Sequence, residues 1–322
     1  MTYHDLLTNA FCSLSAQLGL DPLQVQGPGG NTSIKSDGVM WIKASGKELA
    51  DSETKKIFVA VDLDAARTEA NGQGDGNCKA AVIDPEQKLR PSIETTFHAV
   101  LQWPVVIHTH SVATIVHAIS PQGRVAAAKK LSGLPFAFVP YRKPGLPLTR
   151  EIVASINSDT QIVVLQNHGL ICCGQTVQEA AALIAAVESR LALAVTDVVA
   201  APGESPPEGT RWAANATKLA TDSRLFDLAR AGSYYPDHVV FLGPALPQFG
   251  EAQDRPAMLV KGKGVLIRTD ATPTQASMLD CLAAVLSRLP EDWQAEPIGE
   301  ESEADLMNWD AEKYRMTLAR RG

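Results

Sequence analysis

The chain has 322 residues, enough to bury a substantial core in one large domain or two modest ones. Hydrophobic residues make up 45% of it and charged residues 20%, an ordinary balance for a soluble globular protein. The net charge of −7 comes without any basic run, which argues against a surface that binds a phosphodiester backbone. We therefore expect no nucleic-acid partner.

The cysteines indicate a reducing compartment. There are five, scattered along the chain, and neither their odd number nor their spacing suits a disulfide framework. Asp5 stands where a signal peptide would have apolar residues, and no apolar run approaches membrane-spanning length. The sequence predicts a cytoplasmic protein with no membrane partner.

The first part of the chain combines a helix with two glycine-containing turns. Apolar residues at helical spacing predict an amphipathic helix over residues 5–20. A hairpin over 33–43 follows, flanked by small polar turns at 27–32 and 44–47. Because glycine leaves backbone N–H groups uncovered, the two turns are able to converge on one phosphate, with Lys47 nearby. Two plain tight turns are the alternative.

Glu94 is a candidate for either helix capping or catalysis. A strand is predicted over 58–62 and a loose glycine-rich loop over 71–77, before an apolar helix that begins near Ser92. Ser92 suits the N-cap, and Glu94 falls in the first turn, where the helix dipole favours a carboxylate. Capping alone would account for this carboxylate, so its role stays open at this point.

The chain is organised around Val105–Ser111, a short apolar strand that ends in the pair His108 and His110. Because side chains alternate along a strand, the two imidazoles share a face and make half of a transition-metal site. A second apolar strand at 163–168 also ends in a histidine, His168. Three such residues favour a metal site, and histidines that are only hydrogen-bonded or solvated are the alternative.

A proline-rich segment divides the chain further on. Residues 201–209 contain three prolines and two glycines, which is typical of a linker. We predict a catalytic domain over 1–200, a linker over 201–210 and a smaller α/β extension over 211–322. The other predicted elements are helices at 112–119, 150–156, 178–199, 213–221, 224–231, 274–289 and 303–320, and strands at 136–140, 170–173, 239–242, 258–261 and 265–268.

The extension resembles part of the first domain. Residues 283–289 match residues 185–191 at six of seven positions, and the hairpins upstream of them also align. If this is a degenerate repeat, residues 236–290 form a strand-turn-strand-helix unit in which Lys263 replaces His168 and no metal binds. Such a unit would bind an anion or serve as an assembly surface. Chance similarity between two alanine-rich helices is the alternative.

Five short motifs lie within roughly residues 5–200. They are Gly30-Asn31-Thr32-Ser33, Lys43-Ala44-Ser45-Gly46, Pro91-Ser92-Ile93-Glu94-Thr95, His108-Thr109-His110 and Asn167-His168-Gly169. In this order they resemble the class II aldolase/adducin family, which includes fuculose-phosphate and rhamnulose-phosphate aldolases and ribulose-phosphate 4-epimerase. The extension resembles the segment that follows the aldolase part in aldolase/dehydrogenase fusions.

The resemblance implies a three-layer α/β/α fold with a central, mostly antiparallel sheet, and the short hairpins also argue against a doubly wound parallel sheet. It implies a homo-oligomer, a tetramer with active sites near subunit contacts. His108, His110 and His168 would hold Zn²⁺ or another divalent transition metal, with Glu94 as a fourth ligand that swings away to act as general base. The substrate phosphate would be held by Asn31, Ser45, Gly46 and Ser92.

Two departures from the family pattern concern the substrate. Ile93 stands where aldolases of the family often have a second serine, so one phosphate donor is missing. No tyrosine occurs in residues 111–134, where some relatives carry a proton donor, and Tyr141 or Tyr314 is the candidate here.

The sequence therefore predicts a metal-dependent lyase of carbohydrate metabolism. It would cleave a C–C bond of a small hydroxy-carbonyl compound, a sugar phosphate, by retro-aldol chemistry through a metal-bound enediolate. A decarboxylase or epimerase at the same metal is the alternative enzyme. A non-catalytic, adducin-like scaffold is the alternative of another class, although a scaffold needs neither the three histidines nor the glutamate.

Overall fold

The computed structural model describes residues 3–195, 199–252 and 254–319. The chain forms two compact units that interleave along the sequence. The first comprises Met1–Ser111 and Lys130–Arg190, and the second comprises Val112–Lys129 and Leu191–Gly322. The domain boundaries predicted around the linker at 201–210 stay a prediction.

The first unit is built on a seven-stranded sheet in the order β3-β2-β1-β4-β7-β6-β5. All neighbouring strands are antiparallel except β5 and β6, which are parallel. The predicted mostly antiparallel sheet is therefore confirmed. The strands are β1 (Asn31–Ser36), β2 (Val39–Lys43), β3 (Phe58–Asp62), β4 (Val105–Thr109), β5 (Phe136–Val139), β6 (Ile162–Leu165) and β7 (Gly169–Gly174).

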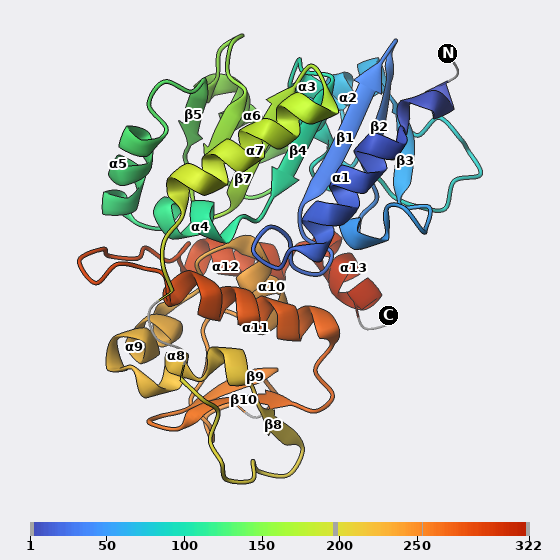
Figure 1. The fold of residues 1–322 in the computed structure, drawn as a ribbon. Helices are drawn as coiled ribbons and strands as arrows, with labels where there is room; N and C mark the ends of the chain where they lie inside the picture. The colour runs from blue at the N-terminus through green and yellow to red at the C-terminus, as the bar shows by residue number, and fades with distance from the viewer. Residues whose placement is uncertain (1–2, 196–198, 253, 320–322) are drawn as a thin grey trace. The chain divides into compact units, whose positions relative to one another are not determined.

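Helices cover both faces of this sheet, which confirms the three layers. Alternating residues of β2 show this, since Trp41 packs with Phe11 of α1, whereas Met40 packs with Ala66 of α2. Figure 1 shows α1 and α7 in front of the sheet, and α2, α3 and α6 contact one another behind it. The helices are α1 (Asn9–Leu20), α2 (Leu63–Ala70), α3 (Thr95–Val100), α6 (Leu146–Ser155) and α7 (Val177–Leu191), with 3-10 turns at Tyr3–Leu6 and Leu49–Asp51.

A tight hairpin turn presents His168. Leu165 pairs with Gly169, so β6 and β7 are joined by a turn of three residues in which Asn167 has φ 52°. Asparagine tolerates this left-handed conformation better than most residues do. We predicted that His168 lies at the end of a strand over 163–168, but it lies in the turn. The strand stops at Leu165, where the apolar run gives way to polar residues.

The second unit holds a smaller antiparallel sheet in the order β8-β10-β9. Its core is formed by apolar side chains of α11, such as Met278 and Leu282, which pack with residues of α4 and α10. The strands are β8 (Thr210–Trp212), β9 (Ala257–Val260) and β10 (Gly264–Arg268). The helices are α4 (Val112–Ala118), α5 (Pro121–Lys130), α8 (Lys218–Thr221), α9 (Ser223–Ala231), α10 (Pro236–Leu242), α11 (Pro273–Leu286), α12 (Glu300–Met307) and α13 (Asp310–Ala319), with a 3-10 turn at Ala214–Ala216.

The strand predicted over 239–242 was wrong, because these residues lie in α10. Their apolar run is buried on every side, so it has no helical period, and periodicity cannot separate a buried strand from a buried helix. Pro236 at the first helical position and Asp237 in the first turn are start signals that favoured the helix.

Two predicted helices are shorter than expected. The helix predicted over 178–199 ends at Leu191, after which Leu193 packs into the core of the second unit. Residues 196–198 lie outside the described residues. The tail helix predicted over 303–320 is divided into α12 and α13, and Asn308 is the C-cap residue of α12. Residue 320 lies outside the described residues.

The β9–β10 hairpin has the same turn as β6–β7. Val260 pairs with Gly264, and Gly262 has φ 75° at the place where Asn167 has φ 52°. The Lys263 side chain is exposed and forms an ion pair with Glu204 at 2.8 Å. The two hairpins thus have turns of the same length and conformation. The first strand predicted for the 236–290 unit is helical, however, and the repeat itself stays a prediction.

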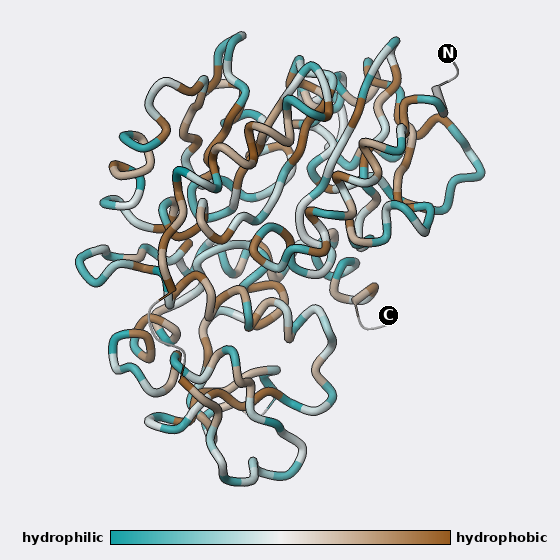
Figure 2. The backbone as a smooth tube through the Cα atoms, viewed as in Figure 1, coloured by the Kyte–Doolittle hydropathy of each residue, from teal (hydrophilic) through white to brown (hydrophobic). Residues whose placement is uncertain are grey.

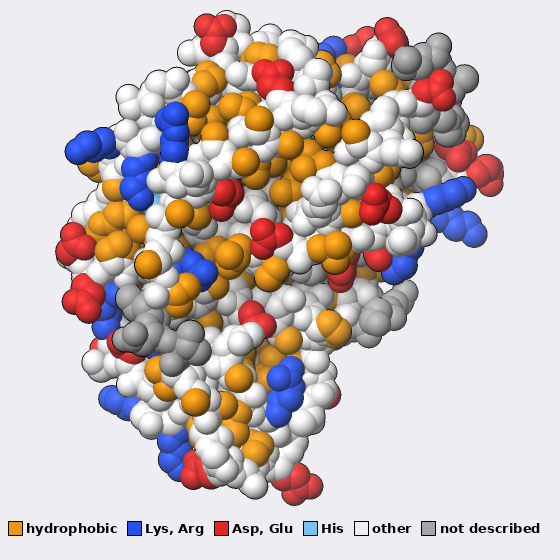
Figure 3. Space-filling model, viewed as in Figure 1, with side chains coloured by type: hydrophobic (Ala, Val, Ile, Leu, Met, Phe, Trp, Pro, Cys, Tyr) orange, Lys and Arg blue, Asp and Glu red, His pale blue; other side chains and the backbone are white. Residues whose placement is uncertain are grey.

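Hydrophobic residues are concentrated between the layers of the fold, and most charged residues lie on its surface. In Figure 2 the brown, hydrophobic stretches include the central strands of the large sheet, which lie between the helical layers. Acidic and basic side chains are interspersed on the face shown in Figure 3. Within residues 3–195, 199–252 and 254–319, every helix is too short or too polar to cross a lipid bilayer.

We expect Gly169→Ala to destabilise the first unit by about 1–3 kcal/mol, the usual cost of forcing atoms into a packed site. An added Cβ would lie 2.3 Å from the Thr109 carbonyl oxygen, so backbone would have to move. Urea unfolding measures the effect. The matched control is Gly203→Ala, where a Cβ meets no atom within 4 Å. Equal midpoints for the two variants would contradict the close approach.

Candidate metal centre

Three buried imidazoles converge beside the ends of β4 and β6. His108 belongs to β4, His110 is the first residue after that strand, and His168 lies in the β6–β7 turn. Each offers a ligand atom within 4.8 Å of the others, and the ring centroids are 4.9–5.4 Å apart. One ion can therefore be reached by all three rings.

A hydrogen bond to the backbone orients His108. Its Nδ1 lies 3.0 Å from the carbonyl oxygen of Leu170 on the neighbouring strand β7. Since a carbonyl can only accept, Nδ1 carries the hydrogen, and Nε2 is the ring nitrogen that lies beside Glu94. Metal-binding histidines commonly use this arrangement, in which the second nitrogen is held by a carbonyl or carboxylate.

Glu94 lies against the same group of rings. Its Oε2 is 3.5 Å from His108 Nε2 and its Oε1 is 3.5 Å from His168 Nε2. Burial alone would raise the pKa of Glu94, but the facing imidazoles and a hydrogen bond from Asn31 hold it below the usual value. Three histidine nitrogens beside a carboxylate are ligand types that fit a divalent transition metal such as Zn²⁺.

Glu94 occupies the N-cap position of α3, yet its side chain makes no capping hydrogen bond. The carboxylate instead accepts a hydrogen bond of 2.8 Å from the Asn31 amide. Ser92, which we expected to cap the helix, accepts from the same amide at 3.1 Å and from the Glu94 backbone N–H at 3.2 Å. Capping therefore does not account for the Glu94 side chain.

The two predicted phosphate-binding turns lie close to Ser92. Ser45 donates from its backbone N–H to Arg90 O and from its hydroxyl to Pro91 O, and Gly46 follows with φ 71°. Lys43, which sequence interpretation missed, ties the turns together. Its buried ammonium donates to Pro28 O and to Lys47 O, both at 2.7 Å.

His98 is a second residue that sequence interpretation missed. It lies four residues after Glu94, one helical turn further on, so it faces the same side of α3. Its ring is fully buried and makes hydrogen bonds to Asn31 and Ser33. The spacing from Glu94 was the signal that could have singled it out.

The two candidate proton donors lie in different units. Tyr141 follows β5, whose carboxyl end points to the same sheet edge as those of β4 and β6. Tyr314 lies on α13 in the second unit. The role of either tyrosine stays a prediction.

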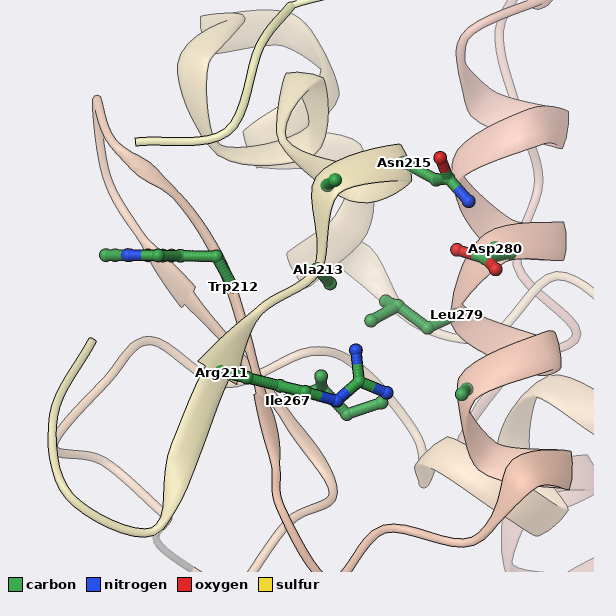
Figure 4. Close-up of a pocket in the computed structure, with 9 residues that line it drawn as sticks. Arg211, Trp212, Ala213, Asn215, Ile267, Leu279 and Asp280 are labelled. Atoms are coloured by element: carbon green, nitrogen blue, oxygen red, sulfur yellow. The ribbon is translucent and has the colours of Figure 1, made fainter. Parts of the chain in front are cut away.

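A separate hollow of about 210 Å³ lies within the second unit, between β8, β10 and α11. Figure 4 shows Asn215 and Asp280 facing each other there, with the apolar side chain of Leu279 beside them. Burial raises the pKa of Asp280, and a hydrogen bond with Asn215 opposes the shift. The lining holds neither histidine nor cysteine, so it does not resemble the site of the first unit.

Residues 9–195 match the model of the family described as Class II Aldolase and Adducin N-terminal domain. Since this match covers more than half of the chain, the protein belongs to the class II aldolase/adducin family. The fold agrees, because the N-terminal class II aldolase domain of a conserved protein from Thermoplasma acidophilum superposes with a TM-score of 0.51. That similarity has 27% identity and covers 59% of this chain and 93% of the other.

Two curated relatives differ in the activity their names state. An uncharacterized oxidoreductase, YuxG, of Bacillus subtilis is 32% identical over 176 residues, which are 49% of this chain and 25% of that protein. An L-fuculose phosphate aldolase of Methanocaldococcus jannaschii is 25% identical over 193 residues, which are 56% of this chain and 91% of that protein. The chain thus spans a quarter of the first relative and most of the second.

We expect His168→Ala to lower the affinity for Zn²⁺ by more than about 100-fold, because even the loss of an outer-shell partner costs about 10–100-fold. Two imidazoles from one strand would leave the site incomplete. Competition with a chromogenic chelator measures the affinity. His117→Gln, which changes a buried histidine of the second unit, is the control. Unchanged binding in the first variant would place the metal elsewhere.

Proposed function

We propose that this protein is a divalent-metal-dependent lyase that cleaves a C–C bond of a small hydroxy-carbonyl compound, with a phosphorylated sugar as the substrate class. The observation that carries the proposal is the position of Glu94. An ionised, buried carboxylate lies 3.5 Å from two imidazoles of a three-histidine group, where a substrate hydroxyl can meet both a base and a cation.

Glu94 would act as the general base. It accepts the proton of the hydroxyl at the carbon β to the carbonyl, and that oxygen becomes the new carbonyl as the C–C bond breaks. The electron pair of the broken bond passes into the carbonyl of the other fragment. A bound Zn²⁺ or similar ion, held by His108, His110 and His168, would stabilise the negative charge that develops there.

The residues around Glu94 would hold the substrate phosphate. Ser92 Oγ accepts two hydrogen bonds, so its hydroxyl hydrogen can be donated to a ligand. The amide of Asn31 adjoins it, and the Ser45–Gly46 turn lies beside Pro91. Proton donation to the product by Tyr141 or Tyr314, and assembly as a homo-oligomer, complete the proposal.

A decarboxylase or epimerase would use the same base and the same metal, so product analysis must separate the three reactions. We expect purified protein to contain a divalent metal and to release an aldehyde from a sugar phosphate. Screening of sugar phosphates and aldonate phosphates, with NMR detection of the products, tests this. Carbon dioxide release would favour the decarboxylase, and a metal-free, inactive protein would favour the scaffold.

Glu94→Gln should lower kcat by about 10²–10⁴-fold, the usual contribution of a positioned acid or base. The three imidazoles remain, so we expect bound metal to be largely retained. Steady-state kinetics and elemental analysis of the same preparation give both quantities. Glu179→Gln changes a carboxylate that accepts from Gln161 and should leave kcat unchanged. Near wild-type turnover in Glu94→Gln would refute the base assignment.

A further inference from the structure

A buried chain of hydrogen bonds leads from His98 to Glu94. His98 Nδ1 lies 2.7 Å from Ser33 Oγ, and His98 Nε2 is hydrogen-bonded to Asn31 Oδ1. The Asn31 amide nitrogen then donates to Glu94 Oε2 and to Ser92 Oγ. All of these side chains are buried, so water does not compete for their hydrogen bonds.

The sheet register builds this chain. Asn31 pairs with His108 and Ser33 pairs with Val106, so Asn31 and Ser33 point to the face on which α3 lies. His98 of α3 faces both of them. One strand and one helix thus supply every member except Ser92 and Glu94, which directly precede that helix.

Only one orientation of the Asn31 amide satisfies these contacts. The carboxylate of Glu94 can only accept, so the amide NH₂ group must face it and the amide oxygen must face His98. His98 Nε2 must then carry a hydrogen. Burial, with Lys35 and His108 nearby, lowers the pKa of His98 well below its usual range, so the ring is neutral and Nδ1 accepts from the Ser33 hydroxyl.

We propose that His98 is a positioning residue: its Nε2–H holds the Asn31 amide in the orientation that aims the Glu94 carboxylate at the three-histidine group. Without this donor the amide can rotate and set its oxygen against the carboxylate. Two facing acceptors repel each other, so the Glu94 carboxylate would turn away from the three-histidine group. The catalytic consequence rests on the proposed function, whereas the orientation of the amide does not.

Two substitutions of His98 separate the donor from the volume of the ring. In His98→Gln the introduced amide nitrogen can occupy the place of Nε2 and donate to Asn31. In His98→Asn the shorter side chain can reach Ser33 but not Asn31. We expect His98→Asn to lower kcat roughly 10–100-fold, as losses of outer-shell partners do, and His98→Gln to recover most of it.

A coupling experiment distinguishes positioning from simple destabilisation. If His98 acts through Asn31, then His98→Asn should lower kcat no further once Asn31→Ala is present, whereas independent effects would multiply. Thr96→Val on the same helix removes a buried hydrogen bond to Thr149 without touching Asn31, and it measures what a weakened α3 costs. Multiplicative losses, or an equal loss in Thr96→Val, would overturn the proposal.

The tautomer of His98 can be measured without any substrate. In protein labelled with ¹⁵N-histidine, long-range proton–nitrogen correlations distinguish the two ring nitrogens, and His98→Gln assigns the signal among seven histidines. We expect a hydrogen on Nε2 and none on Nδ1. An unprotonated Nε2 would overturn the proposal even in an active lyase. The expected tautomer in a protein without lyase activity would refute the proposed function alone.

Discussion

The cost of keeping an ionised carboxylate away from water is the constraint on which this site depends. A buried charge is stable only when other groups replace the hydrogen bonds and the favourable field of water. Glu94 obtains both, from the Asn31 amide at 2.8 Å and from two imidazoles at 3.5 Å. A bound cation would add to the same stabilisation, so base and metal site support each other.

The sheet meets this constraint through its register. Antiparallel pairing sets Asn31 directly opposite His108, and the β6–β7 turn brings His168 alongside. Both approaches are close: a Cβ at Gly30 would lie 2.8 Å from His108 O, and one at Gly169 would lie 2.3 Å from Thr109 O. Residues separated by well over a hundred positions thus meet at one edge of the sheet because glycine allows the backbones to approach.

Local pattern accounts for most of what the sequence predicted. The His-x-His pair on an apolar strand required only alternation, and the hairpin at 33–43 required only two short runs and a turn. The helix α10 was missed because a fully buried apolar segment has no period, and only Pro236 and Asp237 marked its start. His98 and Lys43 were missed because their roles come from contacts made across the fold, with Asn31 and with the carbonyls of two turns.

The central claim is that one metal ion, bound by the three-histidine group, makes the protein active. The direct test is to strip the protein with a chelator and titrate it with Zn²⁺, recording bound ion and turnover on the substrate found by screening. We predict one tightly bound ion per chain, with turnover that rises in proportion to its occupancy. Turnover in the metal-free protein, or tight binding of one ion that restores no activity, would contradict the account.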